Sequence, residues 1–593
     1  MDRRFKLISG LVLVVLIAVS CATVKKDITV PELQRHIKYL SSDSLKGRLT
    51  GTPGDSLAAV YIKSRMSAYG LKPLNGDGFQ RFKVTEKIMP GKKNSIITGR
   101  NSFNSNNEVA PLSFSENGKV SAEVVFAGYG FSINNDSTKW DDYKGLDVKN
   151  KWVMVLRADP EPDNARSRYA SFSADRVKAL VAKDMGASGV LLVSGQSFDK
   201  SDTFDPLSKG VSSVGIPVLR IKRNVADSIL SGSGKSINEL EKNLNSTKNP
   251  LSFNTGTVVE GESDILNYLT NTRNVVMELP GEDPALKDQF VVFGAHFDHL
   301  GLGGPGSGSR AVDTLAVHHG ADDNASGVAM LIEMAGKFAG SHGSHRRSLV
   351  FVAFTGEEEG LFGSKYFTDN PPIDLSKTDL MVNFDMVGRL KDTKDFQVGG
   401  VGTADSLKER AKAAVDTNLL KLTFSEEGAG PSDHSSFYSR NIPVLYFTTG
   451  AHDDYHTPRD TWDKINYKGM VTAGDLIFRI TSGLANETSK LKFREAGPKE
   501  SQNRAPRRRG VTLGIMPDVT GSIKNGLRVE AVTPGKPAAL GKMLKGDIIT
   551  SIDGKPVNSI DDYMFRLSQL KHGQTISVEV LRNNKKEVLI IQL

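Results

Sequence analysis

Histidines and carboxylates gather in five short segments near the ends of apolar stretches: residues 294–299, 320–327, 356–360, 383–386 and 454–458. In the first segment His296 lies two residues before Asp298, a spacing that places both side chains on one face of a strand. Glu357 and Glu358 follow an apolar run, where unpaired charge is costly unless a cation compensates it. The pattern predicts a divalent-metal site, and two metals that share a bridging carboxylate can also share a water of lowered pKa.

Each segment also has an ordinary structural explanation. Asp322 or Asp323 would serve as a helix cap, and the successive glutamates at 357–359 are typical of a solvated acidic patch. Asp385 fits a strand-end cap, and His456 fits a loop histidine. The metal-site hypothesis therefore depends on all the segments occurring together and in this order.

The only cysteine, Cys21, restricts the types of ligand that are available. No disulfide can form within the chain, and a thiolate-based structural zinc site is excluded. A metal site must use histidine, aspartate and glutamate, and the chain has 11 histidines. The net charge of +8 comes from scattered residues, with no basic stripe interleaved with aromatic residues, so nucleic-acid binding is not predicted.

The elements around these segments alternate between strands and helices. Apolar runs predict strands at 291–295, 349–354, 380–384 and 443–447, and helical spacing predicts helices at 32–40, 56–69 and 325–338. Such alternation predicts an α/β fold with a mostly parallel sheet, whose loops at the carboxyl ends of the strands form the site.

Together the five segments resemble metallopeptidase family 28, the co-catalytic zinc aminopeptidases, over about residues 28–75 and 270–485. The resemblance implies a zinc exopeptidase fold of the phosphorylase/hydrolase type and two Zn²⁺ per chain. It implies these ligands: His296, Asp322 and Asp385 for one zinc, and Asp322, Glu358 and His456 for the other, with Asp322 as the bridge.

The resemblance also implies roles for residues that are not ligands. Glu357 would be the general base that takes a proton from water, and Asp298 would orient His296. Tyr455 would either stabilise an oxyanion or pack in the wall of the site. Glu359 has no implied role and is expected to be exposed or to lie behind the ligands.

Neighbouring residues are expected to contribute less directly. His318 and His319 are predicted to be loop histidines, and Asp433-His434 is predicted to line the substrate pocket or to lie behind the ligands. Arg389 is a candidate for binding a substrate carboxylate.

Residues 118–255 interrupt the peptidase pattern and resemble a protease-associated (PA) domain. The residues that carry the resemblance are 126–130, 141–143 and 148–152. Such inserts are associated with substrate access or partner contact. The remaining catalytic unit is expected at 21–117 and 256–489.

A charged linker is predicted at 490–509, and residues 510–593 resemble a PDZ domain. The segment 511–515 fits a carboxylate-binding loop and the strand that follows it. A PDZ domain binds protein C-termini through such a loop and an open strand edge. A purely structural module that packs on the catalytic domain is the alternative.

The first 20 residues have the pattern of a lipoprotein signal peptide. The positively charged residues Arg3, Arg4 and Lys6 are followed by an apolar run at 7–19, which is shorter than a membrane span. Residues 18–21 resemble a bacterial lipobox, which implies cleavage before Cys21 and its acylation. The alternative is an uncleaved anchor. Ala22 and the absence of an acidic run favour an envelope protein anchored in the outer membrane and facing the periplasm.

The function predicted from the sequence is hydrolysis of N-terminal residues from peptides by a metalloaminopeptidase. A carboxypeptidase or dipeptidase of the same family is the first alternative, and it would need a cationic pocket. A cyclising enzyme of the same fold would use a single zinc. A catalytically inactive binding protein that acts through its PA and PDZ domains is the remaining alternative.

Overall fold

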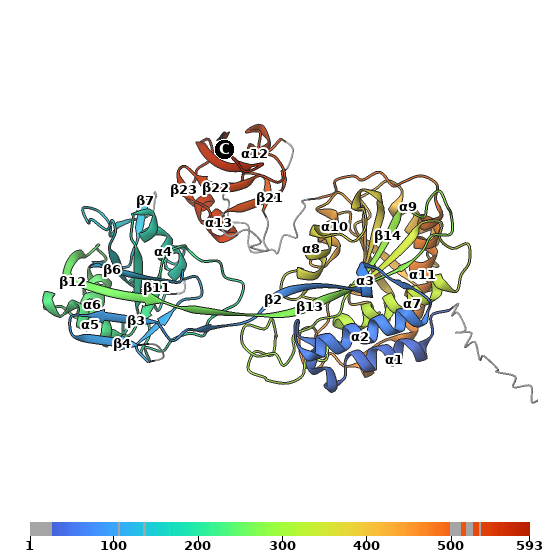
Figure 1. Cartoon of the computed structure of the whole chain (residues 1–593), viewed down its shortest axis with the longest axis horizontal. Coiled ribbons are helices and arrows are strands. Elements are labelled where there is room, and N and C mark those ends of the chain that lie inside the picture. Colours follow the sequence, from blue (N-terminus) through green and yellow to red (C-terminus); the bar gives the residue numbers. More distant parts are fainter. Residues whose placement is uncertain are drawn as a thin grey trace, which may run out of the picture.

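The computed structural model describes residues 27–104, 107–134, 138–164, 167–497, 511–517, 526–532 and 535–593. The predicted signal peptide and Cys21 lie outside the described residues, as does most of the predicted linker. The described strands form three large sheets, of nine, eight and six strands, and one two-stranded ribbon of β7 (Ser132–Asn134) and β8 (Lys139–Asp141). Figure 1 shows the three sheets as separate units.

Four parallel strands form the centre of the nine-stranded sheet, in the order β15-β14-β16-β19. Their bounds are β14 (Phe290–His296), β15 (Ser348–Phe354), β16 (Thr378–Phe384) and β19 (Val444–Thr448). Each matches a predicted strand to within two residues. Every residue of β15 and β16 is buried, as expected for parallel strands that are covered on both faces.

Successive residues of these strands enter two different cores, because strand side chains alternate between faces. One face packs under the helices α1 (Val30–Leu40), α2 (Pro53–Ala68), α7 (Gly327–Ala339) and α11 (Tyr467–Asn486). The other face packs under α8 (Phe362–Asp369) and α10 (His434–Tyr438). The unit is therefore a three-layer α/β domain, which confirms the predicted fold class.

The edges of this sheet are antiparallel, so the sheet as a whole is mixed. β13 (Ile265–Leu279) pairs antiparallel with β15 and also with two N-terminal strands, β1 (Lys72–Pro73) and β2 (Phe79–Pro90). At the other edge β17 (Asp395–Gly399) pairs antiparallel with β19 and parallel with β18 (Lys421–Phe424). α9 (Leu407–Ala414) connects β17 to β18.

The eight-stranded sheet forms the insert and runs in the order β4-β3-β12-β6-β9-β10-β11-β5. Its strands are β3 (Ser95–Thr98), β4 (Asn101–Asn104), β5 (Val109–Pro111), β6 (Gly118–Ala127), β9 (Trp152–Leu156), β10 (Gly189–Val193), β11 (Val218–Ile221) and β12 (Ser252–Ser263). The insert thus begins before residue 118 and ends after residue 255, because β3 to β5 and the end of β12 pair with this sheet. Its helices are α4 (Asp175–Asp184), α5 (Arg223–Leu230) and α6 (Ile237–Thr247).

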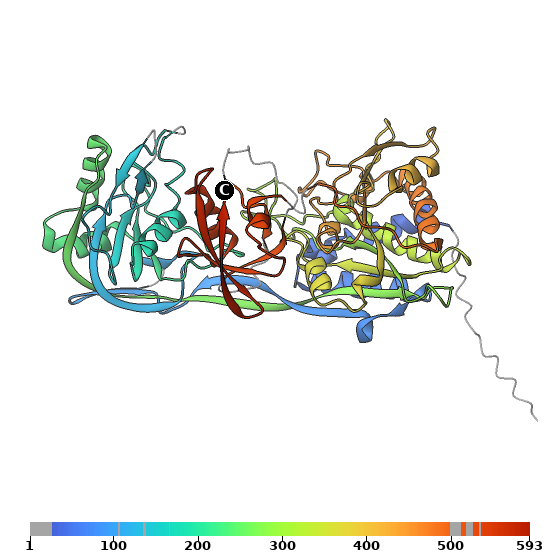
Figure 2. The same cartoon turned by 90° about the horizontal axis from the view of Figure 1, so that it is seen from above.

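Two long strands connect the insert to the catalytic sheet. β2 and β13 pair antiparallel from Phe79↔Val275 to Pro90↔Ile265, with one bulge at Tyr268/Leu269. Figures 1 and 2 show this ribbon running between the insert and the catalytic domain. The chain therefore leaves the catalytic domain and returns to it through one paired ribbon.

The six-stranded sheet forms the C-terminal domain and runs β20-β21-β22-β24-β25, with β23 beside β22. Its elements are β20 (Ile515–Pro517), β21 (Leu527–Val532), α12 (Pro537–Leu540), β22 (Ile548–Ile552), β23 (Lys555–Pro556), α13 (Ile560–Ser568), β24 (Thr575–Arg582) and β25 (Lys585–Gln592). Tyr563 and Leu567 of α13 pack into the core of this domain. Among the described strands, β20 is the edge next to the predicted carboxylate-binding loop.

The C-terminal domain packs against the insert through α13. Arg566 donates two hydrogen bonds to Asp184 of α4, and the Arg566 side chain is buried. Arg176 pairs with the buried Asp562 at 2.9 Å. Phe565 packs against an apolar core of the insert. Figure 1 shows the C-terminal domain lying beside α4.

Part of the predicted linker is ordered against the catalytic domain. Arg494 donates its backbone N–H to Thr403, and Ala496 exchanges hydrogen bonds with Gly428 and Tyr438. Residues 490–497 therefore belong to the catalytic unit, which corrects the predicted start of the linker. None of the described helices is long and apolar enough to cross a membrane.

Candidate metal centre

The candidate ligands meet where the parallel strands end. His296 is the last residue of β14, and Asp385 directly follows β16. Glu358 lies in the loop after β15, and His456 lies in the loop after β19. Parallel strands bring their carboxyl ends to one edge of a sheet, so four separate loops converge there, as the sequence predicted.

The first group of candidate ligands surrounds the ring of His296. Its Nε2 lies 3.4 Å from Oδ1 of Asp323 and 3.4 Å from Oδ1 of Asp385. Oε2 of Glu357 is slightly farther away, at 3.9 Å. His296, Asp323 and Asp385 are all buried and have the spacing of a metal-ligand group.

The second group shares Asp323 with the first. Nε2 of His456 lies 3.2 Å from Oδ2 of Asp323 and 3.1 Å from Oε2 of Glu358. His299 adds a ring that was not predicted, and its Nδ1 lies 2.7 Å from Oε1 of Glu358. His299, Asp323 and Glu358 also have the spacing of a metal-ligand group. Asp323 thus faces both groups, one with each carboxylate oxygen.

Asp322, the predicted bridging ligand, points away from both groups. Its Oδ1 accepts hydrogen bonds from Oγ of Ser326 at 2.9 Å and from the backbone N–H of Gly388 at 2.7 Å. Its Oδ2 lies 3.2 Å from Nε2 of His452. These partners hold the carboxylate of Asp322 away from both groups, so Asp323, and not the predicted Asp322, lies between them.

The turn η3 (Ala321–Ser326) determines this orientation. Buried Asp460 accepts hydrogen bonds from the backbone N–H groups of Asp322 and Asp323, at 2.8 and 3.0 Å. Gly320 has a φ of +54°, and a Cβ there would lie 2.6 Å from the ring of His299. Only glycine fits this approach, so the turn sits directly against the second group.

Asp298 fixes the loop that carries the two glutamates. Its carboxylate accepts the backbone N–H of Glu357 at 3.1 Å and that of Glu358 at 3.3 Å. The Asp298 carboxylate also accepts a hydrogen bond from Oγ1 of Thr50 at 3.1 Å, and it lies 3.7 Å from Nδ1 of His296. Asp298 therefore lies beside His296 and holds the backbone of both glutamates.

The residues present suit divalent metals. Asp323, Glu357, Glu358 and Asp385 place four carboxylates in one pocket, which is a costly concentration of charge without cations. Nδ1 of His296, Nε2 of His299 and Oδ2 of Asp323 are buried without a hydrogen-bond partner. Imidazole and carboxylate groups in such a cluster are the ligand types that Zn²⁺ accepts in sites without cysteine.

The pKa values reflect the same crowding. Burial, together with the charges of Glu358 and Asp385, raises the pKa of Glu357 well above its ordinary value. Burial opposes protonation of His456, but Asp323 and Glu358 outweigh it and raise the His456 pKa to about 10. The carboxylates around His456 therefore stabilise positive charge strongly. A divalent cation brings more positive charge to this place than a proton does.

The other predicted residues occupy distinct places. Tyr455 lines the pocket and stacks on His456, with ring centroids 3.8 Å apart. Arg389 is engaged outside the pocket, where it pairs with Asp454 at 2.9 Å. Glu359 pairs with Lys209 of the insert at 2.9 Å.

The remaining polar residues near the site are mostly buried. Nε2 of His318 forms a hydrogen bond with Oγ of Ser309 at 2.7 Å. Nε2 of His319 forms one with Oδ1 of Asp43 at 3.0 Å. Asp433 is fully buried, and burial raises its pKa to about 7. His434 stacks on Tyr446, a pocket residue, with ring centroids 4.4 Å apart.

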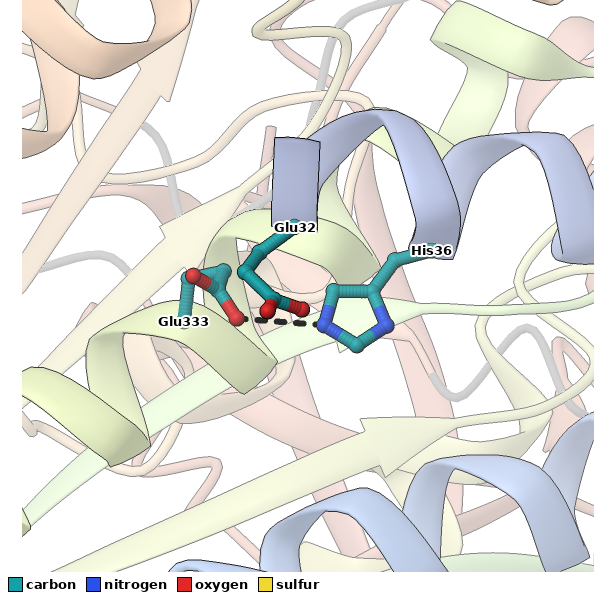
Figure 3. A group of neighbouring side chains, drawn as sticks. All are labelled: Glu32, His36 and Glu333. Atoms are coloured by element: carbon teal, nitrogen blue, oxygen red, sulfur yellow. Dashed lines mark hydrogen bonds and ion pairs between the residues drawn. The ribbon is translucent and has the colours of Figure 1, made fainter. Parts of the chain in front are cut away.

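Another group with the spacing of metal ligands, Glu32, His36 and Glu333, lies among helices α1 and α7 (Figure 3). Here the protein supplies the hydrogen-bond partners. Nδ1 of His36 lies 2.8 Å from the hydroxyl of Tyr61, and Nε2 lies 3.1 Å from Glu333. Tyr69 donates to the same carboxylate at 2.9 Å. This network joins α1, α2 and α7, and we interpret it as structural.

Two cavities adjoin the candidate metal centre. The smaller has a volume of about 360 Å³ and contains the ligand side chains. Away from the ligands it is lined by Met386, Gln397, Pro431, Tyr446, Thr448, Gly450, Ala451 and Tyr455. The larger has a volume of about 1100 Å³ and meets the smaller one at Glu358.

Comparisons with known proteins identify families for two parts of the chain. Residues 274–481 match peptidase family M28, and residues 511–593 match the PDZ domain. Aminopeptidase YwaD of Bacillus subtilis is 23% identical over 457 residues, which cover 74% of this chain and 81% of that relative. A probable zinc metalloprotease of Pyrenophora teres f. teres is 35% identical over 135 residues, 22% of this chain and 26% of the relative.

A solved aminopeptidase from Aneurinibacillus sp. strain AM-1 is 21% identical, with a TM-score of 0.45 over 81% of this chain and 99% of the other. The matched peptidase region contains all the candidate ligands, and the match at 511–593 confirms the predicted PDZ domain. The chain is a zinc metallopeptidase that contains a peptidase family M28 domain at residues 274–481 and a PDZ domain at residues 511–593.

Proposed function

We propose that this protein removes N-terminal residues from peptides with the help of two zinc ions. One zinc would be held by His296, Asp323 and Asp385. The other would be held by Asp323, Glu358 and His456, with His299 beside Glu358. The shared position of Asp323 between the two groups supports two ions rather than one.

Bound zinc ions supply Lewis acidity and lower the pKa of a bound water. The protein's own contribution is Glu357, whose carboxylate faces the pocket without belonging to either ligand group. Its raised pKa suits a group that accepts a proton from water and then donates it to the leaving amine. Asp298 holds the Glu357 backbone and so fixes where this carboxylate can reach.

The lining of the smaller cavity favours cleavage at the N-terminal end of a peptide. Among the residues that the structure describes, its lining contains no lysine or arginine that would bind a C-terminal carboxylate. Arg389, the candidate cation in the sequence, is paired with Asp454 instead. Four carboxylates in the lining favour a protonated or metal-bound amine. Its volume of about 360 Å³ suits a single terminal residue.

The same lining supports a preference for uncharged N-terminal residues. Beyond the ligands and Glu357, the cavity wall is made of uncharged side chains, among them Met386, Tyr446 and Gln397. A charged substrate side chain would lose its hydration there without gaining a partner. Tyr455 stands at the same wall, where its hydroxyl is a candidate for stabilising an oxyanion.

A substrate panel with a metal count tests the proposal. The purified protein should contain two zinc ions per chain and hydrolyse leucyl-p-nitroanilide and free-amine peptides. N-acetylated peptides of the same sequence should not be hydrolysed, because they lack the amine. Release of C-terminal residues from blocked peptides would instead establish the carboxypeptidase alternative. One tightly bound zinc together with cyclising activity would establish the alternative of a cyclising enzyme.

We also propose that the mature protein is a lipoprotein of the bacterial envelope, anchored through Cys21. The proposal rests on the signal pattern of residues 1–21. Acyl chains confer membrane affinity in proportion to their length. Metabolic labelling with a palmitate analogue should mark the wild-type protein and leave Cys21→Ala unlabelled and uncleaved. Equal labelling of both proteins would contradict the anchor.

Two further roles belong to the added domains. The insert, which resembles a PA domain, is proposed to govern substrate access. The PDZ domain is proposed to bind peptide C-termini along β20, whose outer edge has no strand partner among the described residues. Titration of the full chain with a fluorescent C-terminal peptide and with its amidated form distinguishes carboxylate capture from a structural role, since only the free carboxylate should bind.

A further inference from the structure

The larger cavity is lined by two domains. The catalytic domain contributes the start of α2 and the loop at residues 300–308, and β2 contributes residues 82–86. The insert contributes Lys209 and Gly210. With a volume of about 1100 Å³, the cavity exceeds the usual range of about 300–1,000 Å³ for small-molecule sites. A peptide of several residues therefore suits it better than a single amino acid.

One ion pair joins the two walls next to the candidate metal centre. Nζ of Lys209 lies 2.9 Å from Oε1 of Glu359. Glu359 directly follows Glu358, which lines both cavities. The Lys209 side chain is 35% exposed and that of Glu359 is 19% exposed, so the pair lies at the surface of the cavity rather than within a core.

The segment that carries Lys209 is held on both sides. The backbone N–H of Ser208 donates to Oγ of Ser113 at 2.8 Å, and that of Val214 donates to the carbonyl of Phe114 at 2.8 Å. Arg176, which pairs with the PDZ domain, also donates to the carbonyl of Ser212 at 3.2 Å. The wall that the insert presents to the cavity is thus anchored in its own fold.

We propose that Lys209 and Glu359 set the selectivity of this peptidase for substrate length, by fixing the insert as the far wall of a channel for the peptide chain beyond the scissile bond. The inference rests on the proposed aminopeptidase function and names the part of the substrate that the larger cavity receives. A terminal residue would occupy the smaller cavity, and the rest of the peptide would pass Glu358 into the larger one. Short substrates do not reach the pair.

The test compares two substrates in single variants of the full-length protein. Lys209→Ala and Glu359→Gln should each lower the ratio of kcat/KM for a leucine-initiated octapeptide to that for leucyl-p-nitroanilide. The expected change is about two- to fivefold, the range of partly exposed ion pairs. It should appear as a higher KM for the octapeptide with an unaltered kcat, because the pair does not touch the reacting atoms.

Two controls separate this role from general stabilisation. The exchanged pair Lys209→Glu with Glu359→Lys should restore the ratio, since it restores the attraction. Lys242→Ala removes an exposed lysine of α6 in the same insert and should leave the ratio at the wild-type value.

The possible failures have different meanings. An unchanged ratio in Lys209→Ala, or an equal loss on both substrates, overturns the proposed role of Lys209 and Glu359 in length selectivity. A wild-type protein that cleaves neither substrate overturns the aminopeptidase proposal, and the channel with it. Retained cleavage of both substrates with an insensitive ratio leaves the aminopeptidase proposal standing and rejects only the role of Lys209 and Glu359.

Discussion

Asp323 is the residue on which both candidate metal groups depend. Its oxygens face His296 on one side and His456 on the other, whereas Asp322 faces Ser326 and His452. We expect Asp323→Asn to lose at least one of the two zinc ions and Asp322→Asn to retain both. Zinc content measured by mass spectrometry on dialysed protein decides this. Two zinc ions in Asp323→Asn would contradict the assignment.

Glu357 is expected to act on protons and not to hold metal. Glu357→Gln should retain the wild-type zinc content and lower kcat by about 10²- to 10⁴-fold, the usual contribution of a general base. KM for leucyl-p-nitroanilide should change little. Wild-type kcat in the variant would show that another group accepts the proton.

His299 is expected to stabilise the second metal group. Its 2.7 Å contact with Glu358 fixes a proposed ligand, and loss of such a contact typically lowers metal affinity about 10- to 100-fold. His299→Ala should therefore release one zinc at lower chelator concentrations than the wild type. A matched control is His342→Ala, which changes a histidine with a 96% exposed side chain on the surface. Identical chelator profiles for wild type and His299→Ala would rule out this role.

At the scale of residues, the sequence predicts the types of ligand better than their exact positions. His296 ends a regular strand, and Glu358, Asp385 and His456 follow regular strands, so their meeting could be anticipated. Asp323 could not be distinguished from Asp322, because η3 is neither a regular helix nor a strand and the direction of each side chain depends on distant partners. His299 was missed for the same reason. The only available signal was its place next to Asp298.

At the scale of elements, α2 is tied to the sheet by a buried carboxylate. Asp55 accepts hydrogen bonds from Oγ1 of Thr355 at 2.6 Å and from Oγ1 of Thr272 at 2.7 Å. Burial nevertheless raises its pKa to about 7. In the unfolded chain the ordinary value of about 3.9 applies. The folded protein therefore binds the proton more tightly, and this group destabilises the fold as the pH rises from about 4 to about 7.

The replacement Asp55→Asn should remove that dependence. We expect the Tm to fall less between pH 5 and pH 8 in the variant than in the wild type, as measured by differential scanning calorimetry. The neutral amide keeps its charge state across this range. Asp453→Asn, which changes an exposed aspartate, should keep the wild-type slope. Parallel slopes for wild type and Asp55→Asn would contradict the buried titration.

The central strands were predicted within a few residues, because burial on both faces produces long apolar runs. Helices α1, α2 and α7 were predicted as closely from their helical spacing, whereas α11 was not predicted. The antiparallel edges were not. β13 and β17 differ from the parallel strands in their partners rather than in composition, and pairing direction is a long-range property. The insert was placed too narrowly for a related reason, since β3 to β5 are only three or four residues long and show which sheet they belong to only through pairing.

At the scale of the whole molecule, the PDZ domain is fastened to the insert by two ion pairs. The double variant Arg176→Ala with Asp184→Ala removes the partners that the insert supplies to the buried Arg566 and Asp562, and it leaves the PDZ domain itself unchanged. We expect the domains to separate, with a larger radius of gyration by small-angle X-ray scattering. The control Lys242→Ala should have the wild-type radius of gyration. A wild-type radius of gyration in the double variant would contradict the role of the two ion pairs.

The position of the PDZ domain could not be anticipated from the chain. Its identity follows from local turns and strands, but its docking depends on contacts such as Arg566 with Asp184, 382 residues apart. The charged side chains involved resemble other surface residues in the sequence. These charged side chains are buried only by the contact between the PDZ domain and the insert, which the sequence does not reveal.

The ribbon of β2 and β13 has a consequence for how the peptidase domain tolerates its insert. Pro90 and Ile265 are direct partners, so the intervening domain begins and ends at adjacent points of a hairpin. To the peptidase domain, the insert is a hairpin loop. The entropy of closing a flexible loop grows only with the logarithm of its length, roughly 0.6 kcal/mol for each doubling. A hairpin end can therefore accept modules of very different sizes, or a short turn, without rearrangement of the catalytic sheet.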